Sequence, residues 1–365
     1  MGRDAEREGR CGMNSQIEGA VMPRVAEMAP EPVWIEPRPD APSSRVIEGK
    51  NLRDSVGGIG GRLYYWEYAE RVRKAMKWNV PSINYVRGSM HLKAALICGG
   101  GPSLKASIPA VRELQRRGGI VITVNKTHDH FQNPEWLESC AGHDPTPIKP
   151  WGHVVLDPMP WVADYIARPL PGVKYFVASS CNPSVMRKLR LGGGECYLWH
   201  AGADFYGVPM PHEILQREFP NKPWGIVVGP TTVGLRSVIL GYDLGFRMFH
   251  LLGFDSSMAK VNGEFKLHAY EKTRPVDSNE GLVTLHTKIG DYSFYTNDHM
   301  GRQATDFEDL IEQIYNHIVS GRWEPVDLRV HGDGLLPCYA ASIGLHADEA
   351  MNREFQGVKE DEKAA

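Results

Sequence analysis

The sequence predicts an α/β fold with a doubly wound, mainly parallel sheet and helices on both faces. Two observations predict it: short apolar runs alternate with helical segments from Leu92 onward, and the helical segments end at glycines. Several runs are apolar throughout, as expected for strands buried on both faces of a parallel sheet. The runs that we expect to be strands are 94–98, 120–124, 153–156, 175–178, 225–228, 248–252 and 327–330.

The expected helices have recognisable ends. Segment 106–117 precedes Gly118, and segment 232–244 precedes Gly245; glycine is favoured there because the residue after a helix often adopts positive φ. In the last long helix, Thr305 and Glu308 form a capping-box pair that predicts its start. Strand–helix alternation of this kind is typical of a Rossmann-like sheet. Residues 256–300 form a long polar stretch, and such loops often carry the substrate site.

The chain divides into four expected regions. Residues 1–45 are rich in Pro, Glu, Arg and Ala and predict a disordered tail. Residues 46–90 predict a helical N-terminal extension, because part of this region has helical apolar spacing. The Rossmann-like domain is expected over 91–335, followed by a partly disordered C-terminal extension over 336–365.

Composition narrows the class of protein. The formal net charge of −3 provides no general attraction to nucleic acid, although a local basic patch would still allow such a partner. No apolar run approaches the ~18–20 residues that span a bilayer, and the charged N-terminal residues lack the apolar region of a secretory signal. The six cysteines are scattered without a C-x-x-C pair. We therefore expect a cytoplasmic protein with no membrane partner.

The sharpest motif is a glycine-rich turn directly after the first strand, Gly99-Gly100-Gly101-Pro102-Ser103-Leu104. Glycines allow backbone N–H groups to approach a ligand, and a helix start favours an anion. Pro102 suits the first helical turn. The motif is neither a Walker A loop nor G-x-G-x-x-G. We expect the turn to bind the phosphates of a nucleotide; the alternative is a tight turn without a ligand.

Other strand ends should meet at the same edge of the sheet, where open α/β folds bind ligands. Asn125 could bind a base or ribose, and Lys126 a phosphate. Asp157 and Asp255 are candidate catalytic carboxylates that could hold Mg²⁺, and Gly253 permits close approach. The alternatives are an asparagine in a turn for Asn125, a helix cap or Asx-turn for Asp157, and a solvated loop carboxylate for Asp255.

A second anion-binding corner is expected at Thr231 and Thr232, with Thr232 as N-cap and Arg236 close to the same helix start. Simple helix capping is the alternative. His299 is the candidate catalytic base, because an imidazole can titrate near neutrality. The alternative is an ordinary surface histidine.

Several of these motifs, in order, resemble the MptE-like family, named for 6-hydroxymethylpterin diphosphokinase and found also in motility accessory factors. The resemblance rests on segments 96–104, 154–158, 231–245, 249–255 and 291–296. It implies a Rossmann-like transferase that moves diphosphate from ATP to an acceptor hydroxyl. ATP would bind at residues 99–103, and Mg²⁺ at Asp157 or Asp255.

The layout is also similar to bacterial sialyltransferases that use a CMP-sugar donor. That resemblance implies a nucleotide-sugar at residues 99–104, Asn125 and residues 231–234, with His299 as base. The spacing from His299 to Thr305 differs from the pattern. Three functions therefore stay open: a diphosphokinase-like transferase, a glycosyltransferase, and a non-catalytic protein that binds a nucleotide or a partner. The acceptor and the oligomeric state cannot be assigned from the sequence.

Overall fold

The computed structural model describes residues 65–91, 93–202, 211–262, 264–271, 285–289, 292–347 and 358–359. The tail predicted over 1–45 lies outside these residues, as does the first part of the predicted N-terminal extension. Helix α1, Tyr65–Ala75, begins the described chain. The 3-10 helix η4, Ile83–Val86, follows it and leads toward the first strand.

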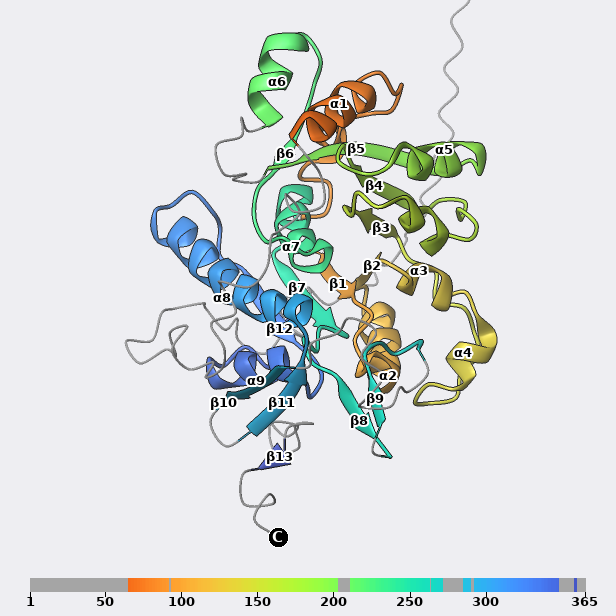
Figure 1. The fold of residues 1–365 in the computed structure, drawn as a ribbon, viewed down its shortest axis with the longest axis vertical. Helices are drawn as coiled ribbons and strands as arrows, with labels where there is room; N and C mark the ends of the chain where they lie inside the picture. Colours follow the sequence, from red (N-terminus) through yellow and green to blue (C-terminus); the bar gives the residue numbers. More distant parts are fainter. Residues whose placement is uncertain are drawn as a thin grey trace, which may run out of the picture. The chain divides into compact units, whose positions relative to one another are not determined.

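Eight parallel strands form the main sheet, in the order β12-β7-β1-β2-β3-β4-β5-β6 (Figure 1). Their bounds are β1 Ala94–Cys98, β2 Ile120–Val124, β3 Gly152–Val155, β4 Lys174–Ala178, β5 Glu195–Ala201, β6 Ile226–Val227, β7 Met248–Leu252 and β12 Asp327–Val330. The predicted fold class is confirmed, and each predicted strand lies within one residue of its expected bounds. Strand β5 was not predicted, because its alternating polar residues weaken the apolar signal.

The strand order reverses beside β1. Strands β1 to β6 follow the chain toward one edge, whereas β7 pairs with the opposite side of β1 and β12 pairs beyond it. The pairing of β1 with β7 ends at Cys98 and Leu252, so the segments that follow these two residues begin side by side. This is the topological switch point at which open α/β sheets bind ligands.

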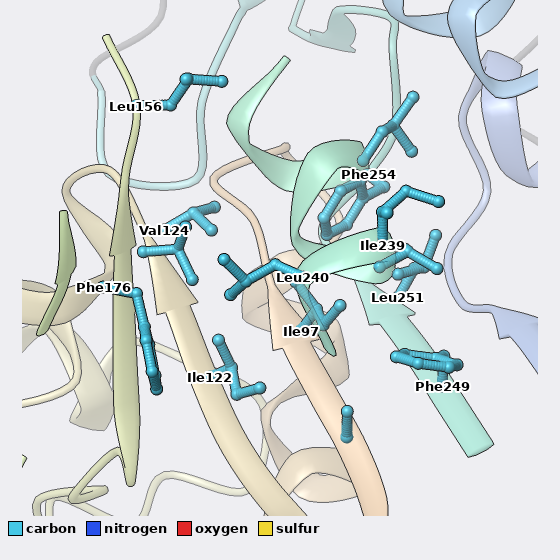
Figure 2. Packing of buried hydrophobic residues seen from close by; sticks show 14 of the residues in the cluster. Ile97, Ile122, Val124, Leu156, Phe176, Ile239, Leu240, Phe249, Leu251 and Phe254 are labelled. Carbon is cyan, nitrogen blue, oxygen red and sulfur yellow. The ribbon is translucent and has the colours of Figure 1, made fainter. Parts of the chain in front are cut away.

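Helices cover both faces of the sheet. On β1, Leu96 and Cys98 pack in one buried cluster with residues of α2 (Leu104–Arg116), whereas Ala95 and Ile97 pack in the other. Residues of α7 (Val233–Leu244) and α8 (Asp298–Val319) join this second cluster. Figure 2 shows Leu240 of α7 packed beside Ile97, and Ile239 of the same helix beside Leu251. Alternate residues of a strand face opposite sides, so both layers bury apolar surface.

Two predicted helix ends agree with the structure and one differs. Helix α2 ends just before Gly118, whose φ is 94°. Helix α7 begins after Thr232 and ends at Gly245, whose φ is 109°. The predicted start of α8 at Thr305 was wrong, because Asn297 caps the helix eight residues earlier by accepting the Met300 N–H at 2.9 Å. Thr305 lies inside the helix and donates to the Gly301 carbonyl. A capping-box pattern within a longer helical segment therefore marked no helix end.

Shorter elements complete the described chain. They are α3 Thr127–His130, α4 Pro134–Glu138, η5 Pro160–Tyr165, α5 Pro183–Leu191, α6 Pro211–Glu218, the hairpin β8 Ala259–Val261 and β9 Glu264–Lys266, the small sheet β10 Leu285–Ile289, β11 Tyr292–Thr296 and β13 Val358–Lys359, and α9 Leu335–Ser342. The predicted boundary between residues 335 and 336 falls at the start of α9, whose Leu335 and Leu336 belong to the main core cluster.

Within the described ranges, no helix is both long and apolar enough to span a bilayer.

Candidate functional site

A cavity of about 510 Å³ lies at the carboxyl ends of the strands. It is bordered by the segments that follow β1, β2, β3, β6 and β7 and by the first turns of α8. The predicted site residues that line it are Gly99, Gly100, Gly101, Asn125, Asp157, Thr231, Thr232, Gly253, Asp255 and His299. Pro102, Ser103 and Leu104 belong to the turn but do not line the cavity.

The glycine-rich turn is tied to the end of β7. The Gly99 N–H donates to the Leu252 carbonyl and the Gly101 N–H to the Gly253 carbonyl, both at 2.8 Å. In the described part of the chain, no acceptor pairs with the Gly100 N–H. Gly100 lines the cavity, and its N–H is the one backbone donor of residues 99–104 for which the described chain provides no acceptor. Helix α2 starts only at Leu104, so Pro102 precedes the helix instead of lying in its first turn.

The side chain of Asp255 contacts the start of α2. This side chain is buried, and its Oδ2 accepts the Ser103 N–H at 3.0 Å. A Cβ at position 101 would lie 2.1 Å from this oxygen, so only glycine at position 101 leaves room for the carboxylate. Burial raises the pKa of Asp255 to about 7, and nearby Asp333 adds to the rise. The carboxylate thus takes the N–H at the helix start where the sequence predicted a phosphate, and phosphate binding by the turn stays a prediction.

Asp157 and Asp255, the two candidate metal ligands, line the same cavity, and each carboxylate already accepts a hydrogen bond from a backbone N–H. Asp157 Oδ1 accepts the Met159 N–H at 2.9 Å, as in an Asx-turn, and Asp255 accepts the Ser103 N–H. Among the residues that the structure describes, no group of three or more His, Cys, Asp or Glu side chains is arranged to hold a metal ion. Mg²⁺ commonly uses only one or two protein carboxylates, so the magnesium site stays a prediction.

The turn between β6 and α7 is held from both sides. The buried Arg236 donates from Nε to the Pro230 carbonyl at 2.6 Å and from its two Nη atoms to the carbonyls of Gly202, Val227 and Gly229. Its guanidinium therefore supports the turn, in contrast to the anion-binding role considered from the sequence. On the other side, Asp306 of α8 accepts the Thr231 N–H at 2.9 Å and also its hydroxyl.

Helix α8 brings polar side chains to the cavity wall. His299 is exposed and lies in the first turn, and Arg302 and Gln303 follow on the same helix. Arg302 Nε donates to Asp306 Oδ1 at 2.9 Å, which links the Thr231 turn to a positive charge at the wall. Sequence reasoning missed Arg302 and Gln303, because it placed the start of this helix beyond them.

Aromatic side chains form another part of the wall. Trp161 and Tyr165 come from η5, directly after the strand end at Asp157, and the Trp161 side chain is 48% exposed. Tyr270 follows the β8–β9 hairpin, and its ring stacks with the rings of His130 and His268 at centroid distances of 4.6 Å and 5.2 Å. Trp161 could have been found from its position after a strand end. Tyr270 lies in the long polar stretch that carried no pattern.

Comparison with known proteins gives little. No family model matches the chain, and no curated protein matches it. Among solved structures, a match is the MAf glycosyltransferase from Magnetospirillum magneticum AMB-1, at 15% identity and a TM-score of 0.47. The match covers 76% of this chain but only 37% of that chain. A similarity of this strength carries nothing about function, and the MptE-like resemblance stays a prediction.

Proposed function

We propose that this chain is a transferase that binds a nucleotide-linked donor in the cavity beside Gly100. The observation that carries the proposal is the position of the cavity. It lies at the topological switch point between β1 and β7, next to a three-glycine turn with an available N–H. Switch-point crevices of open α/β sheets are the usual place for nucleotides in this architecture.

The residues that line the cavity match the chemical groups of a nucleotide-linked donor. Gly100 supplies an N–H to a phosphate oxygen, and Trp161 supplies an exposed ring on which a base can stack. Asn125 has φ of 52°, a conformation that asparagine tolerates better than most residues, and it lines the cavity at the end of β2. Amides and hydroxyls of this kind orient a ligand in an otherwise apolar pocket.

The reaction that these residues support best is glycosyl transfer. An acceptor hydroxyl would attack the anomeric carbon of the donor, the bond from that carbon to the phosphate oxygen would break, and the nucleotide would leave with the bonding electrons. His299 would take the proton from the acceptor hydroxyl, because its exposed imidazole lines the cavity. The acceptor is left unassigned.

A second candidate is transfer of diphosphate from ATP to an acceptor hydroxyl. The observation that favours it is that Asp157 and Asp255 line one cavity, where one or both could hold Mg²⁺ beside a polyphosphate. Asp255 would have to serve the metal through Oδ1, because its Oδ2 already accepts the Ser103 N–H. Asp255 Oδ1 is buried and has no hydrogen-bond partner among the described residues.

Thermal unfolding with a panel of ligands tests the proposal. The panel is ATP, CTP, a CMP-sugar and a UDP-sugar, each with and without Mg²⁺. A donor at 100 times its Kd should stabilise the fold by about 2.7 kcal/mol, a shift of several degrees. Stabilisation by a nucleotide-sugar without metal supports glycosyl transfer, and stabilisation by ATP only with Mg²⁺ supports diphosphate transfer.

Two exposed tryptophans provide a matched control. Trp161→Ala should reduce the ligand-dependent shift, whereas Trp66→Ala should not, because Trp66 is 62% exposed on α1 and does not line the cavity.

For the base, release of nucleotide from the donor that binds should slow in His299→Asn and remain unchanged in His212→Asn, an exposed histidine of α6. Absence of a shift with every ligand would refute the nucleotide-linked donor.

A further inference from the structure

Lys126 directly follows Asn125, a residue that lines the cavity. Asn125 lies at the end of β2, and the residue after Lys126, Thr127, donates its hydroxyl to the Gly99 carbonyl at 3.0 Å. That hydrogen bond fixes the backbone of Lys126 beside the glycine-rich turn. The Lys126 side chain therefore starts from a defined position within reach of that turn.

Two tyrosine rings hold the ammonium group. Lys126 Nζ lies 5.3 Å from the centroid of the Tyr165 ring and 5.6 Å from that of the Tyr270 ring. Both tyrosines line the cavity. A lysine ammonium within about 6 Å of an aromatic face is attracted to it, so the two rings retain the charge at this wall.

No carboxylate of the described chain forms an ion pair with Lys126. Asp129, three residues along α3, is already engaged: its carboxylate pairs with His128 Nδ1 at 2.7 Å and accepts the Ala167 N–H at 2.7 Å. Among the described residues, no carboxylate oxygen lies within ion-pair distance of the Lys126 ammonium, which leaves it able to pair with an anion.

Tyr270 connects this charge to the glycine-rich turn. A Cβ placed on Gly100 would lie 2.8 Å from the Tyr270 hydroxyl, and the Ala269 N–H donates to the Gly100 carbonyl at 3.0 Å. The ring that holds Lys126 thus rests on the residue whose N–H is available. An ammonium and a backbone N–H close to one wall form a combination that binds a phosphate oxygen.

We propose that Lys126, together with the Gly100 N–H, binds the phosphate of the donor, so that the ligand is a nucleoside phosphate and its anion is recognised at this wall of the cavity. This inference rests on the proposed function, because it assigns the phosphate subsite of the same donor. The rings of Tyr165 and Tyr270 position the Lys126 ammonium before the ligand binds.

Isothermal titration calorimetry with matched ligands tests the subsite. The probes are cytidine, uridine and adenosine, each compared with its 5′-diphosphate. Lys126→Met keeps most of the side-chain length but removes the charge. For the diphosphate that binds the unaltered protein, it should weaken binding by about 10-fold to 100-fold, the range expected for one charge-assisted hydrogen bond. Binding of the nucleoside should change little, and Lys126→Arg should restore part of the diphosphate affinity.

Lys174→Met is the control. Lys174 also lies over a tyrosine ring, at 5.7 Å from the Tyr197 centroid, but at the start of β4 and away from the cavity. It should leave diphosphate binding unchanged. If the unaltered protein binds a diphosphate and Lys126→Met binds it equally well, the subsite is overturned while the proposed function stands. Equal loss of nucleoside and diphosphate affinity would also overturn it, since Lys126 would then only support the rings. If no nucleotide binds the unaltered protein, the proposed function itself fails.

Discussion

Replacing Arg236 by methionine tests how the turn beside the cavity is held. The guanidinium is 1% exposed and donates to four backbone carbonyls, those of Gly202, Val227, Gly229 and Pro230. Burial lowers the pKa of Arg236 to about 10, so the side chain stays charged at neutral pH. Methionine fills much of the same volume and offers no donor, so the four carbonyls would lose their partner.

The magnitude follows from two opposing contributions. A hydrogen bond from a charged donor contributes about 1.5–3 kcal/mol, and four are lost. Removing a buried charge returns several kcal/mol of desolvation free energy. Breaking one side of a buried charged interaction typically costs about 3–5 kcal/mol net, and we expect this loss in the free energy of unfolding. Backbone carbonyls cannot be replaced along with the arginine, so the usual gain from an apolar exchange does not apply.

Urea denaturation followed by circular dichroism measures the loss. Arg236→Lys should also be destabilising, because one ammonium cannot reach all four carbonyls with the geometry of a planar guanidinium. Arg116→Met is the control: its side chain is 73% exposed, and the change should stay within about 0.5 kcal/mol. A loss below about 1 kcal/mol for Arg236→Met would refute the reasoning, since the carbonyls would then have found other partners.

Three further predictions concern stability. A Cβ at Gly234 would lie 2.4 Å from Phe254 Cε1, so Gly234→Ala should lower the free energy of unfolding by about 1–3 kcal/mol in thermal unfolding. Adding Phe254→Leu should recover part of this loss. A double variant no more stable than Gly234→Ala would contradict the clash. Asn297→Ala should cost about 1 kcal/mol by removing the cap of α8, and a larger loss in Thr305→Ala would show that the helix starts at the later position instead. Burial lowers the pKa of His200 to about 3, whereas the ordinary value of 6.5 applies in the unfolded chain, which therefore binds a proton more readily. The contribution of the neutral His200 to the free energy of unfolding is fully present above pH 6.5. It decreases as the pH falls below 6.5, by up to about 1.4 kcal/mol per pH unit. His200→Gln should reduce that slope in urea titrations at pH 7, 6 and 5, and an unchanged slope would show that His200 does not couple folding to protonation.

The sequence alone was sufficient for seven of the eight strands of the main sheet, for the helix end at Gly245 and for the position of the glycine-rich turn. These features depend on neighbours along the chain: apolar runs mark buried strands, and glycine marks a residue with positive φ. The order of strands also implied that residues after β1, β2 and β7 would meet, because parallel strands share one carboxyl edge.

Only the tertiary structure decided what those residues contact. Asp255 lies 152 positions from Ser103, and nothing in either local pattern indicates that the carboxylate would take the helix-terminal N–H. Arg236 likewise meets carbonyls from a preceding strand end, Gly202, and from its own turn. Tyr270 reaches Gly100 from a stretch without periodicity. Local patterns determine backbone conformation, whereas side-chain partners depend on how distant segments pack, and that is where the availability of each polar group is decided.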